Sequence, residues 1–86
     1  MADEKKLIGK VTHFFSKINV AGIQLSDTLK VGDRISIVGA TTNFEEPIDS
    51  MQIDNKAVTE AKAGDIIGIK VKEKTRVGDD VYLILA

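Results

Sequence analysis

Apolar side chains recur at every second position along much of the chain, which is the period of a half-buried β-strand. The alternation runs through residues 7–15, 18–25, 34–38 and 66–72, and Ala21-Gly22 interrupts the second of these segments. A glycine inside a strand often marks a bulge or a sharp bend. No segment carries a convincing apolar stripe with the 3.6-residue period of a helix. The pattern therefore predicts an all-β domain.

Two further apolar segments and a repeated turn signal complete the predicted strands. Residues 48–53 form a less regular strand, and residues 81–85 are apolar on both faces, which predicts burial on both sides. A Gly-Asp pair precedes an apolar segment three times, at residues 32–33, 64–65 and 78–79. Short strands at this spacing are typical of a small barrel or sandwich, and closing the sheet into a barrel removes its exposed edges. We expect a closed antiparallel β-barrel of six or seven strands.

Length and composition fit one folded domain. The chain has 86 residues, of which 43% are apolar and 29% charged, as in an ordinary soluble protein. We expect a flexible N-terminus over residues 1–6 and a single barrel domain over residues 7–86. Residues 1–6 lack the apolar core of a signal peptide, and the longest apolar run, 81–86, is too short to span a membrane. These features predict a cytoplasmic protein that does not contact a membrane.

Enzyme chemistry finds little support in the residue inventory. The chain has no cysteine and one histidine, which excludes thiolate zinc sites, cysteine nucleophiles and clusters of several histidines. No serine lies in a G-x-S-x-G turn, and we expect His13 to be a structural residue of the barrel wall. The adjacent carboxylates Glu45-Glu46 and Asp79-Asp80 point apart in an extended chain. We predict a non-catalytic protein without metal or cofactor.

A nucleotide site is also not expected. Gly9-Lys10 is followed by Val11, where a phosphate-binding loop needs serine or threonine, and the preceding glycine of that loop is missing. Without such a loop of backbone N–H groups, nothing holds the phosphates. We expect no GTP binding by this chain alone.

Charge is unevenly distributed, although the net charge is only −1. Residues 41–60 carry five carboxylates against one lysine. If the last alternating strand continues far enough, one of its faces carries a basic row, made of Lys70, Lys72, Lys74 and Arg76. Such a row can follow a phosphate backbone, and it fits a solvated strand face equally well.

Several short motifs occur in the order in which a known barrel has them: Gly9-Lys10-Val11-Thr12, residues 29–35, Asp49-Ser50-Met51-Gln52, residues 61–69 and residues 76–82. Together they resemble the second domain of translational GTPases such as elongation factor Tu and elongation factor 1-alpha. The resemblance implies a stand-alone copy of that β-barrel, acting in protein biosynthesis by contacting tRNA, rRNA or the ribosome. It places Gln52, with Lys56 nearby, where those factors contact the terminal nucleotide of tRNA.

A protein-interaction module is the alternative function. The same barrel packs against a neighbouring domain in those factors, so a detached copy could dock on a GTPase or on a separately encoded enzyme. The predicted docking loop spans residues 43–48, where Phe44 and Ile48 flank Glu45 and Glu46. An exposed aromatic side chain rimmed by carboxylates marks a docking site. The other interpretation is that Phe44 folds back into the core.

Overall fold

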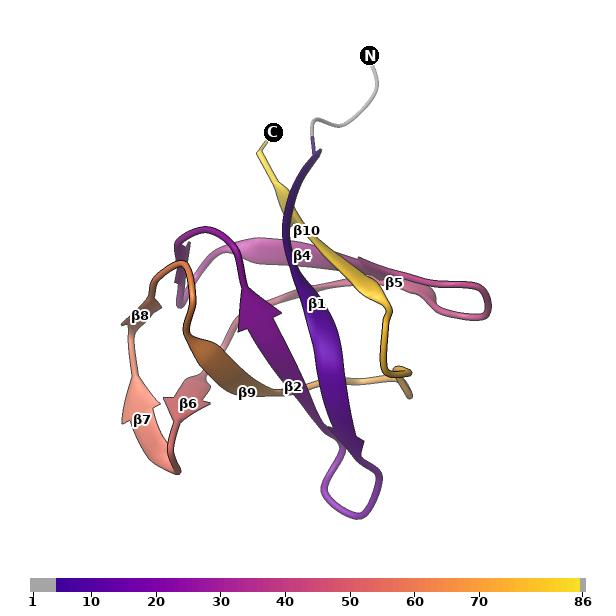
Figure 1. Ribbon diagram of the computed structural model, residues 1–86, viewed down its shortest axis with the longest axis horizontal. Helices are drawn as coiled ribbons and strands as arrows, with labels where there is room; N and C mark the ends of the chain where they lie inside the picture. Colours follow the sequence, from indigo (N-terminus) through magenta and orange to yellow (C-terminus); the bar gives the residue numbers. More distant parts are fainter. Residues whose placement is uncertain (1–4, 86) are drawn as a thin grey trace.

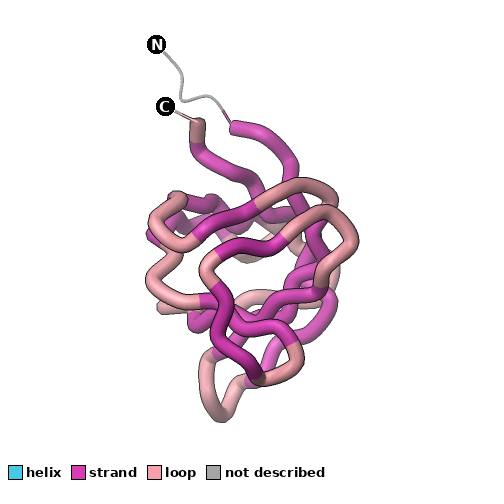
Figure 2. Tube along the Cα trace, turned by 90° about the vertical axis from the view of Figure 1, so that its left-hand side faces the viewer, coloured by secondary structure: helices cyan, strands magenta, loops and turns pink. Residues whose placement is uncertain are grey.

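The computed structural model describes residues 5–85, and all of its regular elements in that range are strands (Figure 1). Figure 2 shows strands joined by loops and turns, with no helix. The predicted all-β class is confirmed, and no helix of the described part could cross a membrane. The strands are β1 (Lys5–Phe15), β2 (Val20–Leu25), β3 (Leu29–Lys30), β4 (Arg34–Val38), β5 (Asn43–Pro47), β6 (Met51–Ile53), β7 (Lys56–Val58), β8 (Glu60–Ala61), β9 (Ile66–Lys70) and β10 (Asp80–Ile84).

Eight of the strands form one antiparallel sheet in the order β5-β4-β10-β1-β2-β9-β6-β7, and β3 pairs separately with β8. Strands β5 and β7 stand at the two ends of this order, and each has one paired neighbour among the described residues. The predicted closed barrel of six or seven strands is therefore not confirmed. The physical reason is that no ladder of backbone hydrogen bonds joins the end strands to each other.

Strand β1 is long because it pairs with two neighbouring strands and bends along its length. It pairs with β10 and with β2, and its register shifts between Leu7 and Gly9 and again between Val11 and His13. Such a β-bulge bends the strand and reverses which side chains face inward. Val11 is buried and Phe14 packs against the core. The alternation predicted through residue 15 therefore fails after Val11.

The second bulge turns the side chain of His13 to the outer face of the sheet. His13 and Phe15 are both exposed, and their rings stack with centroids 6.0 Å apart and an angle of 8° between the planes. His13 belongs to the sheet, where it pairs with Gly22 of β2.

Aliphatic side chains from nearly every strand fill the core. Burial of such a side chain contributes roughly 1.5–3 kcal/mol to folding. The predicted inward residues of β4 and β9 are confirmed, since Ile35, Ile37, Ile67 and Ile69 are at most 2% exposed. The other buried aliphatic members are Ile8, Val11, Ala21, Ile23, Leu25, Leu29, Ile48, Met51, Ala61, Val71 and Val81.

The three Gly-Asp turns share one construction. Each glycine has a positive φ between 92° and 99°, a conformation that glycine adopts without steric cost. The following aspartate accepts a hydrogen bond from the backbone N–H three residues earlier, at 2.9–3.0 Å. The predicted turns are confirmed at Gly32-Asp33, Gly64-Asp65 and Gly78-Asp79.

The expected flexible segment 1–6 lies only partly within the described residues. Residues 1–4 lie outside the described residues. Lys5 and Lys6 already belong to β1, where they pair with Ile84 and Leu83 of β10.

A substitution at Gly9 tests how closely β1 and β2 approach each other. A Cβ added at Gly9 would lie 2.6 Å from the carbonyl oxygen of Gln24 and 3.0 Å from Cγ2 of Ile23. Because a backbone atom cannot yield as a side chain can, we expect Gly9→Ala to lower the free energy of unfolding by about 1–3 kcal/mol. Urea unfolding measures the change.

Gly68→Ala is the matched control on β9. Its added Cβ meets Cγ1 of Val20 at an ordinary 3.4 Å, so we expect a change within about 0.5 kcal/mol. Equal loss of stability in both variants would contradict the described contact between β1 and β2.

Candidate functional site

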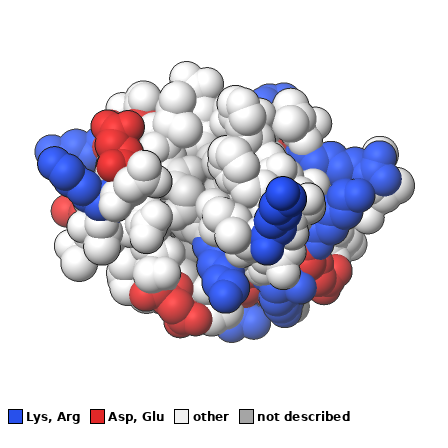
Figure 3. All heavy atoms as spheres, turned by 90° about the horizontal axis from the view of Figure 1, so that it is seen from below, with Lys and Arg blue, Asp and Glu red and all other residues white. Residues whose placement is uncertain are grey.

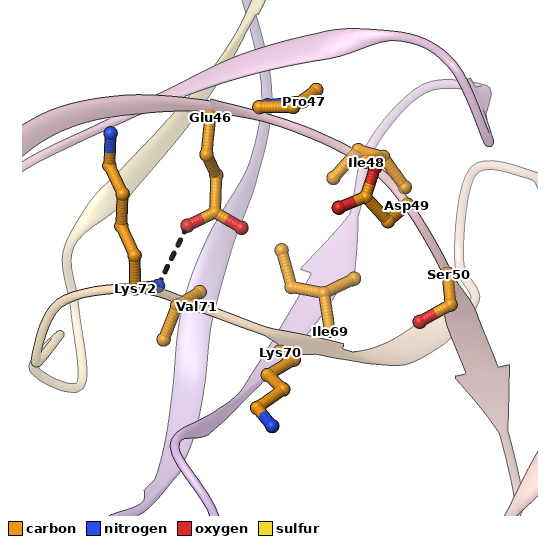
Figure 4. Close-up of a pocket in the computed structure, with 9 residues that line it drawn as sticks. All are labelled: Glu46, Pro47, Ile48, Asp49, Ser50, Ile69, Lys70, Val71 and Lys72. Carbon is orange, nitrogen blue, oxygen red and sulfur yellow. Dashed lines mark hydrogen bonds between the residues drawn. The ribbon is translucent and has the colours of Figure 1, made fainter.

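A hollow of about 370 Å³ lies where the chain after β5 faces the end of β9 (Figure 4). Residues 46–50 line one side and residues 69–72 line the other. This volume lies at the lower end of the range for ligand sites. We call this hollow the seam pocket.

The seam pocket exists because two stretches of chain lie beside each other without pairing as strands. On its inner side, β9 continues along β2, and the Val71 N–H donates to the Asn19 carbonyl at 2.8 Å. On its other side, the pairing with β6 consists of Gln52 opposite Gly68. Beyond Gly68, this edge of β9 has no strand partner among residues 5–85. The edge therefore faces the chain that follows β5.

Glu46 joins the two sides of the seam pocket. Its side chain is 7% exposed, and its Oε1 accepts a hydrogen bond of 3.0 Å from the backbone N–H of Lys72. Figure 4 shows the other carboxylate oxygen directed toward Ile69 and Ile48. The side chain therefore replaces one bond of a β-ladder and leaves an oxygen facing the pocket.

Burial is the main influence on the Glu46 carboxyl group. Burial raises the pKa of Glu46 above its ordinary value of 4.5, because the charged form loses hydration. The hydrogen bond from the Lys72 backbone and the Lys72 charge lower this pKa, and the Asp49 charge raises it. Burial outweighs the two lowering influences.

The seam pocket combines residues that the sequence placed in two separate sites. Lys70 and Lys72 come from the predicted RNA-binding row, and Glu46 and Ile48 come from the predicted docking loop. Lys70 and Lys72 are exposed, and Ile48 is buried. Residues 26 positions apart in sequence are thus adjacent in space.

The predicted basic row does not form a strand face. Strand β9 ends at Lys70, so Lys72, Lys74 and Arg76 lie in the following loop. All four basic side chains are exposed. Glu73 is exposed between Lys72 and Lys74, so buried and exposed residues do not alternate regularly through the row. Figure 3 shows lysine and arginine side chains in separate groups around a largely uncharged face of the molecule.

Gln52 and Lys56, the other predicted RNA contacts, are exposed on β6 and β7. Gln52 lines a second hollow, of about 430 Å³, on the outer face of the sheet. Three large apolar side chains line it too and are half exposed or more: Phe15 at 51%, Ile18 at 59% and Ile66 at 57%. We call these three residues the outer apolar patch.

Sequence reasoning missed the outer apolar patch. A signal existed in the paired apolar residues Phe14-Phe15 and Ile66-Ile67, where one member of each pair must face outward in a strand. Exposed apolar clusters of this kind mark contact surfaces on soluble proteins.

The predicted docking loop is strand β5, and its aromatic residue is not on the surface. Phe44 is 6% exposed, because it stands opposite Ile37 in the pairing of β5 with β4 and faces the core. Ile48 is 2% exposed. Glu45 is partly exposed and lies 3.7 Å from Arg34 and 4.0 Å from Lys5. Phe44 thus takes the alternative position, folded back into the core.

Clustered metal ligands are not found in the described range. Residues 5–85 hold no group of three or more histidine, cysteine, aspartate or glutamate side chains that could bind a metal ion.

The fold matches that of the C-terminal domain of a putative U32 peptidase. The crystal structure of the C-terminal domain of a putative U32 peptidase from Geobacillus thermoleovorans matches with a TM-score of 0.87 and 18% identity, covering 93% of each chain. Its selenomethionine variant matches with a TM-score of 0.85 and 19% identity, over 88% of this chain and 96% of the other. At these identities the match concerns the fold.

Curated proteins with similar sequences carry protease names. An uncharacterized protease of Methanocaldococcus jannaschii is 47% identical over 78 residues, which cover 90% of this chain and 19% of the relative. A collagenase of Porphyromonas gingivalis is 35% identical over 81 residues, which cover 92% of this chain and 22% of the relative. The chain therefore spans about a fifth of these relatives' length. No protein-family model matches it.

These comparisons overturn the resemblance to translation factors. The similar proteins are named as protease and collagenase, and the matching structures come from a putative peptidase. The hypothesis of an elongation-factor domain that binds RNA in protein biosynthesis was wrong. The motifs that carried it were mainly Gly-Asp turns before strands, and such turns serve local geometry in many β-proteins.

Glu46 makes the stability of the domain depend on pH in a defined direction. Because its pKa is raised on folding, the folded state holds more protons than the unfolded state at pH values just above 4.5. Stability of the wild type therefore falls as the pH rises from 4.5 through the raised pKa of Glu46. Glu46→Gln lacks this group and does not share the fall.

Denaturant unfolding of both proteins between pH 4 and pH 8 measures this effect. As the pH rises, we expect the free energy of unfolding of the wild type to fall relative to that of Glu46→Gln. A difference that stays constant, or shifts toward the wild type, would show that Glu46 is not held in a costly buried position.

Proposed function

We propose that this chain is a non-catalytic accessory domain that acts beside a peptidase catalytic domain and contacts polypeptide. The observation that carries the proposal is the extent of the match: 90% or more of this chain aligns with about a fifth of two proteins named as protease and collagenase. Most of each relative's length lies outside the match. The similar fold of a C-terminal peptidase domain supports the same interpretation.

The positions of the carboxylates support a non-catalytic role. Glu46 is bound to a backbone N–H in the seam pocket, whereas Glu45 lies near Lys5 and Arg34. Asp79 is buried and accepts a hydrogen bond within its turn. A catalytic pair of carboxylates, one acting as acid and one as base, would have to be directed at one substrate position, and these three side chains have separate partners.

The outer apolar patch supports contact with another polypeptide. Phe15, Ile18 and Ile66 expose half or more of their surface around one hollow. Covering such side chains removes apolar surface from water and contributes roughly 25 cal/mol per Å². Gly68 also lines this hollow, so the sheet carries no side chain at that point.

Incubation with unfolded polypeptides tests the proposed function. Gelatin and carboxymethylated casein are suitable probes, because relatives of this chain are named collagenase and protease. We expect the purified chain to bind them without cleaving them. Hydrolysis by the chain alone, abolished by Glu46→Gln or His13→Ala, would overturn the proposal.

Variants of the outer apolar patch test where the contact lies. We expect the double variant Phe15→Ser, Ile66→Ser to bind gelatin roughly tenfold more weakly, because about 1.4 kcal/mol of apolar burial is lost. Val77→Ser is the matched control, since Val77 is 69% exposed and does not line the hollow. Equal weakening by the control would remove the patch from the binding surface.

A further inference from the structure

We propose that the seam pocket is a subsite for an arginine side chain of a polypeptide, with Glu46 receiving the guanidinium group. This inference deepens the proposed function and rests on it, because it specifies which polypeptide chemistry the domain recognises. It is carried by three features of the pocket: a buried carboxylate with a free oxygen, apolar walls, and an unpaired strand edge beside them.

The carboxylate of Glu46 is the polar anchor. Glu46 is 7% exposed, and one of its carboxylate oxygens already accepts the Lys72 N–H. Figure 4 shows the second oxygen facing the hollow. The described residues place no hydrogen-bond donor on that oxygen. This oxygen is accessible through the hollow, so a cationic guest can pair with it in a charge-assisted hydrogen bond.

The walls of the pocket fit the stem of a long cationic side chain. Ile48, Ile69 and Val71 line it and are each 2% exposed. Arginine and lysine bury their methylene stems along apolar surface and keep the charged head at a polar partner. The Asp49 carboxylate lies near enough to influence Glu46 electrostatically, and the Ser50 hydroxyl also lines the pocket.

A guanidinium group suits these partners better than an ammonium group. Its five N–H donors lie in one plane and are more weakly hydrated, so it can bond several acceptors at a lower cost of dehydration. Glu46, Asp49 and Ser50 offer such a set of acceptors around one hollow. Lysine has one compact, strongly hydrated head.

The two lysines of the pocket do not fill this position. Figure 4 shows the ammonium of Lys70 directed away from Glu46, and that of Lys72 extended along the opposite side of Glu46. Within residues 5–85, no ion pair within 4.0 Å joins either lysine to Glu46 or Asp49. The charge of Lys72 nevertheless acts on Glu46, so Lys72 competes with a cationic guest.

The free edge of β9 favours a polypeptide over a free guanidinium compound. Beyond Gly68 this edge has no strand partner in the described part of the chain. Strand β9 ends at Lys70 and the Lys72 N–H is bound to Glu46, so the free edge is the short stretch of residues 69–70. Unpaired backbone groups there can pair with an extended segment of another chain. An arginine in an extended peptide can therefore enter the pocket while its main chain binds the edge.

Titration of the ¹⁵N-labelled chain with the peptide acetyl-Ala-Arg-Ala-amide tests the inference. We expect backbone amide signals of Lys70, Lys72 and Ser50 to shift on binding, with millimolar affinity. The same peptide with citrulline keeps the shape and removes the charge, and we expect at least tenfold weaker binding. A lysine peptide should bind more weakly than the arginine peptide.

Variants separate the proposed contact from general electrostatics. Glu46→Gln keeps an oxygen for the Lys72 N–H but removes the charge, and we expect roughly tenfold weaker binding. Glu45→Gln removes the same charge from the neighbouring position outside the pocket and should change binding less than twofold. Lys72→Met removes the competing ammonium group and should tighten binding severalfold. A dispersed amide spectrum of each variant verifies its fold.

The outcomes distinguish this inference from the proposed function. Arginine peptide binding that is insensitive to Glu46→Gln, or equal binding of the citrulline peptide, would overturn the subsite. Binding of butylguanidine without binding of the peptide would overturn the claim that the ligand is a polypeptide. If gelatin still binds through the outer apolar patch in either case, the proposed accessory function stands without the arginine subsite.

Discussion

A single hydrogen bond across an unpaired gap, from the Lys72 N–H to Oε1 of Glu46, is the constraint on which this structure depends. In a closed barrel a ladder of backbone bonds joins the edges that meet. Here the carboxylate spans the gap, because β9 has lost its strand partner beyond Gly68. The burial of Glu46, its raised pKa and the seam pocket are consequences of that arrangement. The buried side chains of Ile48, Ile69 and Val71 line the seam pocket beside this hydrogen bond.

Local patterns predicted the longer strands β1, β2, β4, β9 and β10 and the Gly-Asp turns, but not strand β5 or the closure of the sheet. Ile35, Ile37, Ile67 and Ile69 alternate in the sequence and are buried in the structure. The Gly-Asp turns were predictable because a positive φ and an aspartate acceptor act within four residues. The bulge after Val11 depends on pairing with β2. Whether the end strands meet depends on contacts across the whole sheet, and the alternation of apolar residues carries no information about those contacts.

The sequence allowed the individual residues of the candidate site to be selected, but it did not show that they lie together. Glu46, Ile48, Lys70 and Lys72 were each selected from charge and hydrophobicity, and assigned to two unrelated surfaces. Their convergence follows from the position of β5 relative to the end of β9, a relation between segments more than 20 residues apart. The wrong family assignment has a related cause. Turn motifs report local geometry, so their order along the chain resembled a translation-factor barrel although the similar proteins are named as proteases.

Amide hydrogen exchange at Lys72 measures the central hydrogen bond most directly. If Glu46 holds the seam, the Lys72 amide of the wild type is protected although the residue is exposed and lies in a loop. In Glu46→Ala this amide should exchange at the rate of an unbonded loop amide, while the Val71 amide, bound to Asn19, keeps its protection. Rapid exchange at Lys72 in the wild type, or protection unchanged by Glu46→Ala, would contradict the account.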